Sequence, residues 1–163
     1  MPVTVRRLEA ADAEDYRTIR LVSLEREPDA FGSVYAVEAT RPLSDFAERL
    51  TSSSVFGAYA DGTLVGVAGF KRQAGPKDHH KGFVWGMYVQ GDWRGQGVGR
   101  ALMDAVINAA RGTVEQLTLA VVQGNDAAVV LYGKVGFEVY GIEPRALKSM
   151  SGYSDEVLMV RIL

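Results

Sequence analysis

The stretch from Phe83 to Arg111 constrains the fold more than any other part of the chain. It opens with aromatic and β-branched residues, which are typical of a strand. A turn follows with glycine at alternate positions, Gly95, Gly97 and Gly99. Apolar residues then recur at the spacing of one helical face. These apolar positions are Val98, Ala101, Leu102, Ala105, Val106 and Ala109. The stretch therefore predicts a strand, a glycine-rich turn and a helix, in that order.

The turn predicts an anion-binding site. The first amides of a helix have no partner inside the helix and carry partial positive charge. Glycines without a Cβ let a bulky anion approach the backbone closely. Arg94 and Arg100 add positive charge, and the planar guanidinium group suits phosphate. We therefore expect a phosphate or pyrophosphate cradle at residues 94–100.

Two common nucleotide-binding motifs do not fit this turn. A Walker loop ends in Gly-Lys-Ser/Thr, whereas this chain has Gly99-Arg100-Ala101 at the helix start. A dinucleotide fold carries its glycines in the first strand-turn-helix unit with a two-residue gap. Here the turn lies past mid-chain, and its glycines alternate without that gap. For the turn taken alone, a glycine-capped loop entering a surface helix is the remaining alternative.

Residues 89–99 resemble the acyl-CoA signature of the GNAT superfamily of N-acetyltransferases, with its [RQ]-x-x-G-x-[GA] turn. A second block also resembles the family: Leu119-Ala120-Val121, then Asn125, then Leu-Tyr-Gly-Lys-Val-Gly-Phe at 131–137. The resemblance covers nearly the whole chain, most strongly residues 83–141. It implies that acetyl-CoA is the co-substrate. It also implies direct acetyl transfer to a primary amine of a small molecule or of a peptide or protein N-terminus.

The rest of the chain mixes strand and helix patterns, which predicts an α/β (α+β) fold with a mixed sheet. Strands are expected at 3–8, 54–60, 64–70, 83–89, 116–122, 137–140 and 156–162. Helices are expected at about 12–26, 43–50, 98–111 and 125–135, with Asp12 and Ser44 as caps of the first two. Asp61-Gly62 predicts a tight hairpin, and residues 141–155 are expected to form a loop. By resemblance, the sheet is mostly antiparallel and twisted, with about seven strands, about four flanking helices and a splay at the central strands.

Composition narrows the function classes. The chain has 163 residues with 47% hydrophobic and 23% charged residues, as expected for a single domain spanning 1–163. A net charge of −2 and the lack of a basic run argue against nucleic acid as a partner. The absence of cysteine excludes a cysteine nucleophile and thiolate metal sites, and we expect no metal. The chain shows no signal-like start and no long apolar run, so no membrane contact and a cytoplasmic location are expected. A homodimer through the late strands stays open.

The resemblance assigns the cofactor contacts residue by residue. Backbone groups of Met87, Tyr88 and Val89 are expected to pair with the pantetheine arm, and one N–H there to polarise the thioester carbonyl. The pyrophosphate contacts are expected at Arg94, Gly95, Gln96, Gly97, Val98, Gly99 and Arg100. Asn125 is expected to contact the pantetheine arm, and Tyr132 is expected to contact the sulfur of coenzyme A. The two residues lie seven positions apart, about 10 Å along one helix face.

Tyr132 is the candidate catalytic residue, because a tyrosine hydroxyl can hydrogen-bond or protonate the departing thiolate. The alternatives are that Asn125 is only a helix cap and Tyr132 only a packed core residue.

The general base is not assigned by the sequence. Many family members use a carboxylate on the central strand, but this strand contains no Asp or Glu. His79 and His80 precede the strand and titrate in a suitable range, with solvated loop residues as the alternative. Glu25, Glu27 and Glu38 flank the expected acceptor wall, with plain surface charges as the alternative. A chain of waters would need no dedicated base.

Candidate acceptor contacts are Phe31, Trp85, His80 and Tyr153. The stretches 28–33 and 141–156 resemble a subgroup of the superfamily. Phe31, Trp85 and Tyr153 would suit an acceptor with an apolar part, whereas plain core packing is the alternative.

Two other functions are left open by the sequence. One is a catalytically silent acyl-CoA-binding sensor module, which the missing strand carboxylate favours. The other is a binder of non-acyl nucleotides, which the missing Walker and dinucleotide features disfavour.

Overall fold

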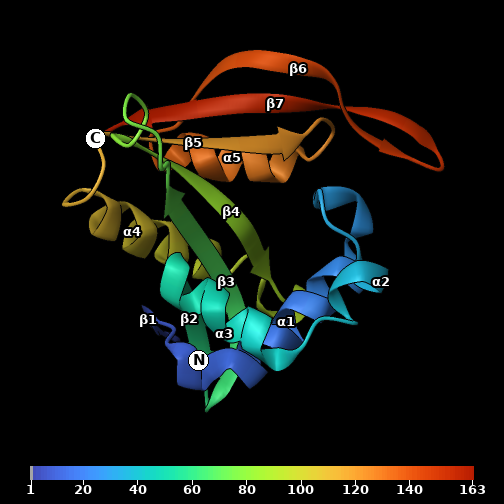
Figure 1. Cartoon of the computed structure of the whole chain (residues 1–163), viewed down its shortest axis with the longest axis vertical. Helices are drawn as coiled ribbons and strands as arrows, with labels where there is room; N and C mark the ends of the chain where they lie inside the picture. The colour runs from blue at the N-terminus through green and yellow to red at the C-terminus, as the bar shows by residue number, and fades with distance from the viewer. Residues whose placement is uncertain (1) are drawn as a thin grey trace.

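The computed structural model describes residues 2–163 and consists of a seven-stranded sheet with helices on both faces (Figure 1). The strands are β1 (Thr4–Arg7), β2 (Ser54–Ala60), β3 (Thr63–Arg72), β4 (Lys81–Val89), β5 (Gln116–Val122), β6 (Glu138–Ser149) and β7 (Gly152–Ile162). The helices are α1 (Ala13–Arg26), α2 (Tyr35–Glu38), α3 (Leu43–Ser52), α4 (Val98–Ala110) and α5 (Asp126–Lys134). Short 3₁₀ turns are η1 (Ala10–Asp12), η2 (Pro28–Ala30) and η3 (Gly91–Trp93). The sheet order is β1-β2-β3-β4-β5-β7-β6. Within residues 2–163 every neighbouring pair is antiparallel except β4 and β5, which confirms the predicted mixed sheet.

The sheet opens between β4 and β5. These two strands pair only at Lys81–Phe83 with Gln116–Thr118, and then diverge (Figure 1). On its other edge β4 carries one extra residue relative to β3, because Val67 pairs with Tyr88 while Gly69 pairs with Trp85. Such a bulge bends a strand locally. Gly86 provides the left-handed backbone at this point, with φ of +67°. The predicted splay at the central strands is thus confirmed.

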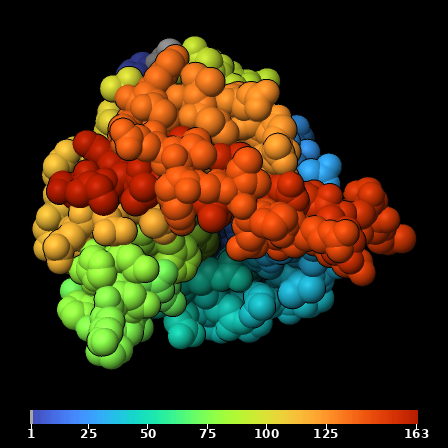
Figure 2. Space-filling view, turned by 90° about the horizontal axis from the view of Figure 1, so that it is seen from above, coloured from blue at the N-terminus to red at the C-terminus, as the bar shows by residue number. Residues whose placement is uncertain are grey.

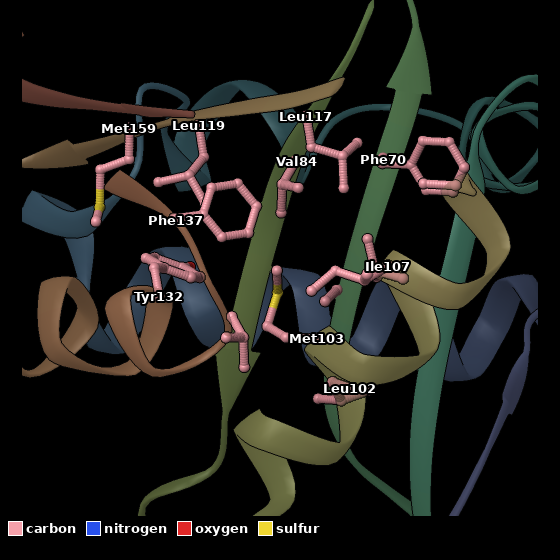
Figure 3. Packing of buried hydrophobic residues seen from close by; sticks show 14 of the residues in the cluster. Phe70, Val84, Leu102, Met103, Ile107, Leu117, Leu119, Tyr132, Phe137 and Met159 are labelled. Carbon is pink, nitrogen blue, oxygen red and sulfur yellow. The ribbon is translucent and has the colours of Figure 1, made fainter. Parts of the chain in front are cut away.

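Helix α4 covers one face of β2, β3 and β4, and α5 covers the same face of β5 and β7 (Figure 3). The fully buried positions of α4 are Val98, Leu102, Met103, Val106, Ile107 and Ala110. The predicted apolar face was therefore wrong in part, since Met103 and Ile107 point to the core and the alanines at 101, 105 and 109 flank it. Gly66 lets the helix lie close to the sheet. A Cβ there would lie 3.0 Å from Leu102 Cδ1 and 3.3 Å from the Tyr88 carbonyl oxygen.

A buried ion-pair network joins α1, α2 and α3 on the opposite face. Glu38 is 2% exposed and accepts hydrogen bonds from Arg20 Nε (3.1 Å), Arg20 Nη2 (3.0 Å) and Arg49 Nη1 (2.7 Å). Burial by itself would raise the pKa of the Glu38 carboxyl. Hydrogen bonds from Arg20, Ser33 and Arg49 prevail and lower this pKa to about 2. The network fixes α2, and with it the segment that follows α1, against the rest of the fold.

The predicted loop at 141–155 is wrong, because β6 and β7 form one long hairpin that turns at Met150-Ser151. Figure 2 shows the far end of this hairpin projecting beyond the rest of the surface. β6 is an edge strand exposed along most of its length, so polar and apolar residues do not alternate as they do in a half-buried strand. Pro144 is tolerated because an edge strand does not need every N–H. Arg145 beside it has φ of +52° in an irregular stretch of the β6–β7 pairing.

Local turn signals gave mixed results. Asp61 and Gly62 both have positive φ, 48° and 79°, which confirms the tight hairpin between β2 and β3. Asp12 is the N-cap residue of α1, as predicted, but its side chain does not bond to that helix. Its carboxylate instead accepts hydrogen bonds from the Glu9 amide and from Arg6. Ser44 lies inside α3, whose N-cap is Pro42. In the described chain, no helix combines the length and the hydropathy needed to cross a bilayer.

Replacing Glu38 by Gln should lower the free energy of unfolding by about 3–5 kcal/mol at neutral pH, because two guanidinium groups lose their shared partner charge. The pKa of Glu38 in the folded protein, about 2, lies below its ordinary value of 4.5. The carboxylate therefore stabilises the folded state fully above pH 4.5, and this contribution is lost as the pH falls toward 2. Urea unfolding of both proteins from about pH 3 to 7 measures the difference. The exposed Glu48→Gln variant is the control. A wild-type advantage that does not shrink at low pH would contradict the assignment.

Candidate functional site

The turn before α4 holds a row of free backbone amides. In the described residues, the amides from Gly95 to Arg100 donate to no carbonyl or side chain, and the next one, Ala101, donates to Gly97. Gly95 and Gly97 have φ of +76° and +82°, conformations that favour glycine. No atom lies within 4 Å of a Cβ built on either residue. The turn is therefore open and lies at a helix N-terminus, which is the geometry that the predicted anion cradle requires.

A groove of about 550 Å³ runs from this cradle to α5. It is lined by Met87, Val89, Trp93, Arg94, Gly95, Gly97, Val98, Gly99, Arg100, Ala127, Ala128, Leu131 and Lys134. Gly99 forms part of its floor, because a Cβ there would lie 3.0 Å from Met87 Cε and 3.1 Å from Leu131 Cδ2. Arg100 and Lys134 also border a neighbouring cavity that contains Arg111 and Arg161. No sequence pattern indicated this second cationic surface, since its members come from three separate segments.

Two residues of the predicted cradle have other partners. Arg94 donates from Nε to the Val89 carbonyl and from Nη2 to Glu27 Oε1, both at 3.0 Å. Gln96 Nε2 donates to the Asp92 carbonyl at 2.9 Å, within the η3 turn. Arg94 thus ties the turn to the end of α1 while still lining the groove. Tyr88 and Val98 have buried side chains, so the backbone is what these two positions can offer a ligand.

Tyr132 is held by the C-terminal structure of α5. The Phe137 amide donates to the Tyr132 carbonyl and the Gly136 amide to the Gly133 carbonyl, which is the Schellman arrangement. Gly136 supplies the left-handed conformation, with φ of +95°. The Tyr132 and Phe137 rings pack edge to face with centroids 6.0 Å apart (Figure 3). The ring therefore has one defined position in the core.

The Tyr132 hydroxyl is nevertheless free. The residue is only 8% exposed, and its hydroxyl makes no hydrogen bond with any part of the chain that the structure describes. Burial raises the pKa of Tyr132 to about 12. The phenol therefore stays protonated at neutral pH and can donate a hydrogen bond to a ligand.

The opening between β4 and β5 gathers most of the other predicted residues. A cavity of about 150 Å³ is lined by Phe31, Trp85, Met87, Asn125 and Tyr132, among others. We call this space the wedge cavity. Asn125 Oδ1 accepts the Ala128 amide at 3.4 Å and so caps α5. Its amide nitrogen has no partner within residues 2–163, so capping leaves a donor at the cavity.

Two predicted acceptor residues lie elsewhere. His80 precedes Lys81 at the closed end of β4 and lies six positions before Gly86 at the bulge, about 20 Å along a strand. Tyr153 lies next to the hairpin turn of β6 and β7, is 54% exposed and stacks under Arg145 and Lys148. Neither lines the wedge cavity. The aromatic and histidine patterns gave no information on distance along the strands, which is why these two residues were grouped with Phe31 and Trp85.

The other candidate bases also differ in their surroundings. Glu25 is exposed on α1, Glu27 pairs with Arg94, and Glu38 is buried in its ion-pair network. The His79 ring lies 3.3 Å from the Gly75 carbonyl in the loop before β4. None of these four side chains lines the wedge cavity.

A carboxylate pair near the wedge cavity was missed. Glu156 on β7 pairs with Val122 on one side and with Glu143 on the other. Val122 lines the wedge cavity. Because side chains alternate along a strand, Glu156 lies on the sheet face opposite to Val157 and Met159, which contact the α4–α5 core. Burial and the charge of Glu143 raise the pKa of the Glu156 carboxyl. The sequence could not reveal this pair without the register of three strands.

Comparison with known proteins identifies the family of this chain. Residues 16–137 match the acetyltransferase (GNAT) family. The chain is 34% identical over 148 residues to N-alpha-acetyltransferase RimI of Mycobacterium tuberculosis, covering 88% of this chain and 84% of that protein. It is 27% identical to L-amino acid N-acetyltransferase AaaT of Escherichia coli, covering 93% and 94%. The structure of yncA from Salmonella typhimurium, solved with its cofactor acetyl-CoA, superposes with a TM-score of 0.86 at 21% identity, over 100% of this chain and 95% of that one.

The family match covers most of the chain, including the cradle, Asn125 and Tyr132. The chain therefore belongs to the GNAT family, and it is an acetyl-CoA-dependent N-acetyltransferase.

Proposed function

We propose that residues 1–163 form one catalytic domain that moves the acetyl group directly from acetyl-CoA to a primary amine of a small molecule or of a peptide N-terminus. The observation that carries this proposal is the unpartnered hydroxyl of Tyr132, a buried residue that lines the wedge cavity together with Met87 and Asn125. Direct attack of an amine on a thioester needs no enzyme nucleophile, and the chain contains no cysteine. The names of RimI and AaaT support amine acceptors of both kinds.

The cradle is the proposed pyrophosphate site. Six free amides point out of one turn, and the glycines keep bulk away from them. Arg100 and Lys134 lie between the groove and the cavity that holds Arg111 and Arg161. This second group of cations suits the additional phosphate of coenzyme A.

The pantetheine arm is proposed to lie against β4 beyond Phe83, where the edge facing β5 has no strand partner. An extended chain with amide groups can pair with such an edge as a strand does. One N–H near the bulge at Gly86 and Met87 would then polarise the thioester oxygen in the transition state. The free Asn125 amide supplies a second contact to the arm.

The chemistry requires two proton losses from the acceptor. The ammonium group loses one proton before its nitrogen attacks the thioester carbon, and the nitrogen loses another as the C–S bond breaks. The pKa of Tyr132 is about 12. Tyr132 is therefore a weaker acid than a thiol, whose pKa is about 8.5. Tyr132 therefore stabilises the leaving sulfur mainly by donating a hydrogen bond, and the sulfur ends as the free thiol with the nitrogen's proton.

Glu156 is the proposed base for the first proton, directly or through water. It lies beside the wedge cavity on the face turned away from the helical core. A contact on the same face links this part of the hairpin to the acceptor segment. Leu147, which pairs with Ser154, lies 3.7 Å from a Cβ built on Gly32. Formation of a homodimer, a cytoplasmic location and the absence of a metal or nucleic-acid partner stay predictions.

Gly97→Glu should abolish binding of CoA, because it places bulk and negative charge in the cradle. Isothermal titration with CoA measures the affinity. Gly62→Glu is the matched control, since Gly62 has nearly the same φ of +79° and also has open space around its Cβ position. Unchanged affinity in Gly97→Glu, or an equal loss in Gly62→Glu, would rule out the cradle.

Tyr132→Phe should lower kcat about 10²-fold while leaving the Kd for acetyl-CoA nearly unchanged, because only the sulfur contact is lost. Stopped assays of thiol release give kcat, with the exposed Tyr140→Phe as control. Since burial raises the pKa of Tyr132 to about 12, wild-type kcat should show no fall from tyrosine ionisation up to about pH 10. Undiminished turnover in Tyr132→Phe would refute the role.

Glu156→Gln should lower kcat/KM about 10²-fold near neutral pH, where the acceptor is mostly protonated. The deficit should shrink as pH approaches the pKa of the acceptor amine, because a free amine needs no base. The pH profile of both proteins tests this, with the exposed Glu138→Gln as control. A deficit that is constant across pH would indicate a structural role for Glu156.

A further inference from the structure

The guanidinium group of Arg20 lies directly behind Gly86, Phe31 and Trp85, which line the wedge cavity, and one of its nitrogens is free. Arg20 is 8% exposed, and its Nε and Nη2 bind Glu38. Its Nη1 makes no hydrogen bond within residues 2–163. A Cβ built on Gly86 would lie 3.6 Å from this Nη1. The free nitrogen of a buried cation is therefore adjacent to the β4 bulge, where the thioester carbonyl is proposed to lie.

Two aromatic residues place Arg20 directly behind the cavity wall. Its guanidinium carbon lies 5.4 Å from the centre of the Phe31 ring and 5.9 Å from that of Trp85. Phe31, Trp85 and Gly86 all line the wedge cavity. Cation–π contacts of this kind favour a fixed guanidinium position. Arg20 is thus held in one place by Glu38 and by two rings that a bound acceptor would contact.

The charges around Arg20 do not balance. Arg20 and Arg49 share the single carboxylate of Glu38, which leaves one positive charge over in the network. Arg17 adds another cation near Phe46, with a buried Nε that has no partner in the described chain. A buried charge without a counter-ion is costly. An anion next to Arg20 Nη1 would offset this cost.

We propose that Arg20 Nη1 binds a carboxylate of the acceptor, so that the preferred acceptors are free amino acids. This proposal rests on the amine acetyltransferase function proposed above. In an α-amino acid the carboxylate and the amine are attached to the same carbon. A carboxylate on Arg20 therefore holds the amine close to the β4 bulge, and an apolar side chain can pack on Phe31 and Trp85. Arg20 makes and breaks no covalent bond and acts as a binding residue.

Paired acceptors test the proposal. We would measure kcat/KM for L-phenylalanine against L-phenylalaninamide, and for L-leucine against L-leucinamide, with saturating acetyl-CoA. Wild type should prefer the acids about 10- to 100-fold, the size expected for a hydrogen bond between charged groups. Arg20→Gln should lose most of this preference, because its kcat/KM for the acids falls while that for the amides changes little. Arg20→Lys should keep part of the preference. Comparing the acid-to-amide ratio between variants cancels the different basicity of the two amines.

Arg49→Gln is the matched control. It removes the same charge and one hydrogen bond to Glu38, but Arg49 contacts Phe46 rather than the residues of the wedge cavity. The acid preference should therefore survive in Arg49→Gln. If Arg20→Gln does not fold, a competition experiment with the wild-type protein still tests the proposal. 3-Phenylpropionate should compete with the acceptor, whereas 3-phenylpropionamide should not.

Equal use of acids and amides by wild type, or an acid preference that Arg20→Gln retains, would overturn the proposal. Turnover of polyamines, aminoglycosides or peptides but of no amino acid would also overturn it, and would leave the proposed acetyltransferase function standing. Absence of thiol release with every amine would instead count against that function itself.

Discussion

β4 and β5 pair at three positions and then separate, and the arrangement of the whole site follows from this. Both strands run in the same direction, so the helices that follow them begin at the same end of the sheet. The divergence places the N-terminus of α4 and the body of α5 on either side of one opening. The cradle lines the groove, and Asn125 and Tyr132 line the wedge cavity. The two spaces are neighbours, because Met87, Ala128 and Leu131 line both. The bulge at Gly86 adds the bend that turns β4 away from β5.

The two ends of this opening have different charges. On the α4 side, Arg100, Lys134, Arg111 and Arg161 gather around the groove and its neighbouring cavity. The proposed acceptor side combines the buried cation of Arg20 with the carboxylates of Glu143 and Glu156. A ligand with several phosphates suits the first side, and a zwitterion suits the second. A net charge of −2 over the whole chain conceals this separation.

The parts of the fold that sequence patterns predicted well are those with local causes. Gly95 and Gly97 of the turn and Asp61-Gly62 of the hairpin need only their own backbone conformations, and all four residues have positive φ. Asn125 caps the short helix that contains Tyr132, so the geometry of that one helix sets their spacing.

The errors arose where partners are distant in sequence. Glu156 lies in a register set by β5, β6 and β7, and most of β6 has no buried face to give its sequence a period of two. In the sequence, nothing distinguishes Arg20 from other helix residues. Only the structure shows that Glu38, Phe31 and Trp85 surround it. His80 and Trp85 are close in sequence, yet an extended strand carries them far apart.

The unpaired edge of β4 also links cofactor supply to folding. Backbone groups that lack a strand partner are satisfied by water in the empty protein. A pantetheine arm on this edge would complete the sheet with atoms that are not part of the chain. Native protein would then gain stability by mass action, about 2.7 kcal/mol when free cofactor exceeds its Kd a hundredfold. The resistance of this enzyme to unfolding in a cell would thus rise and fall with the concentration of its own acetyl donor.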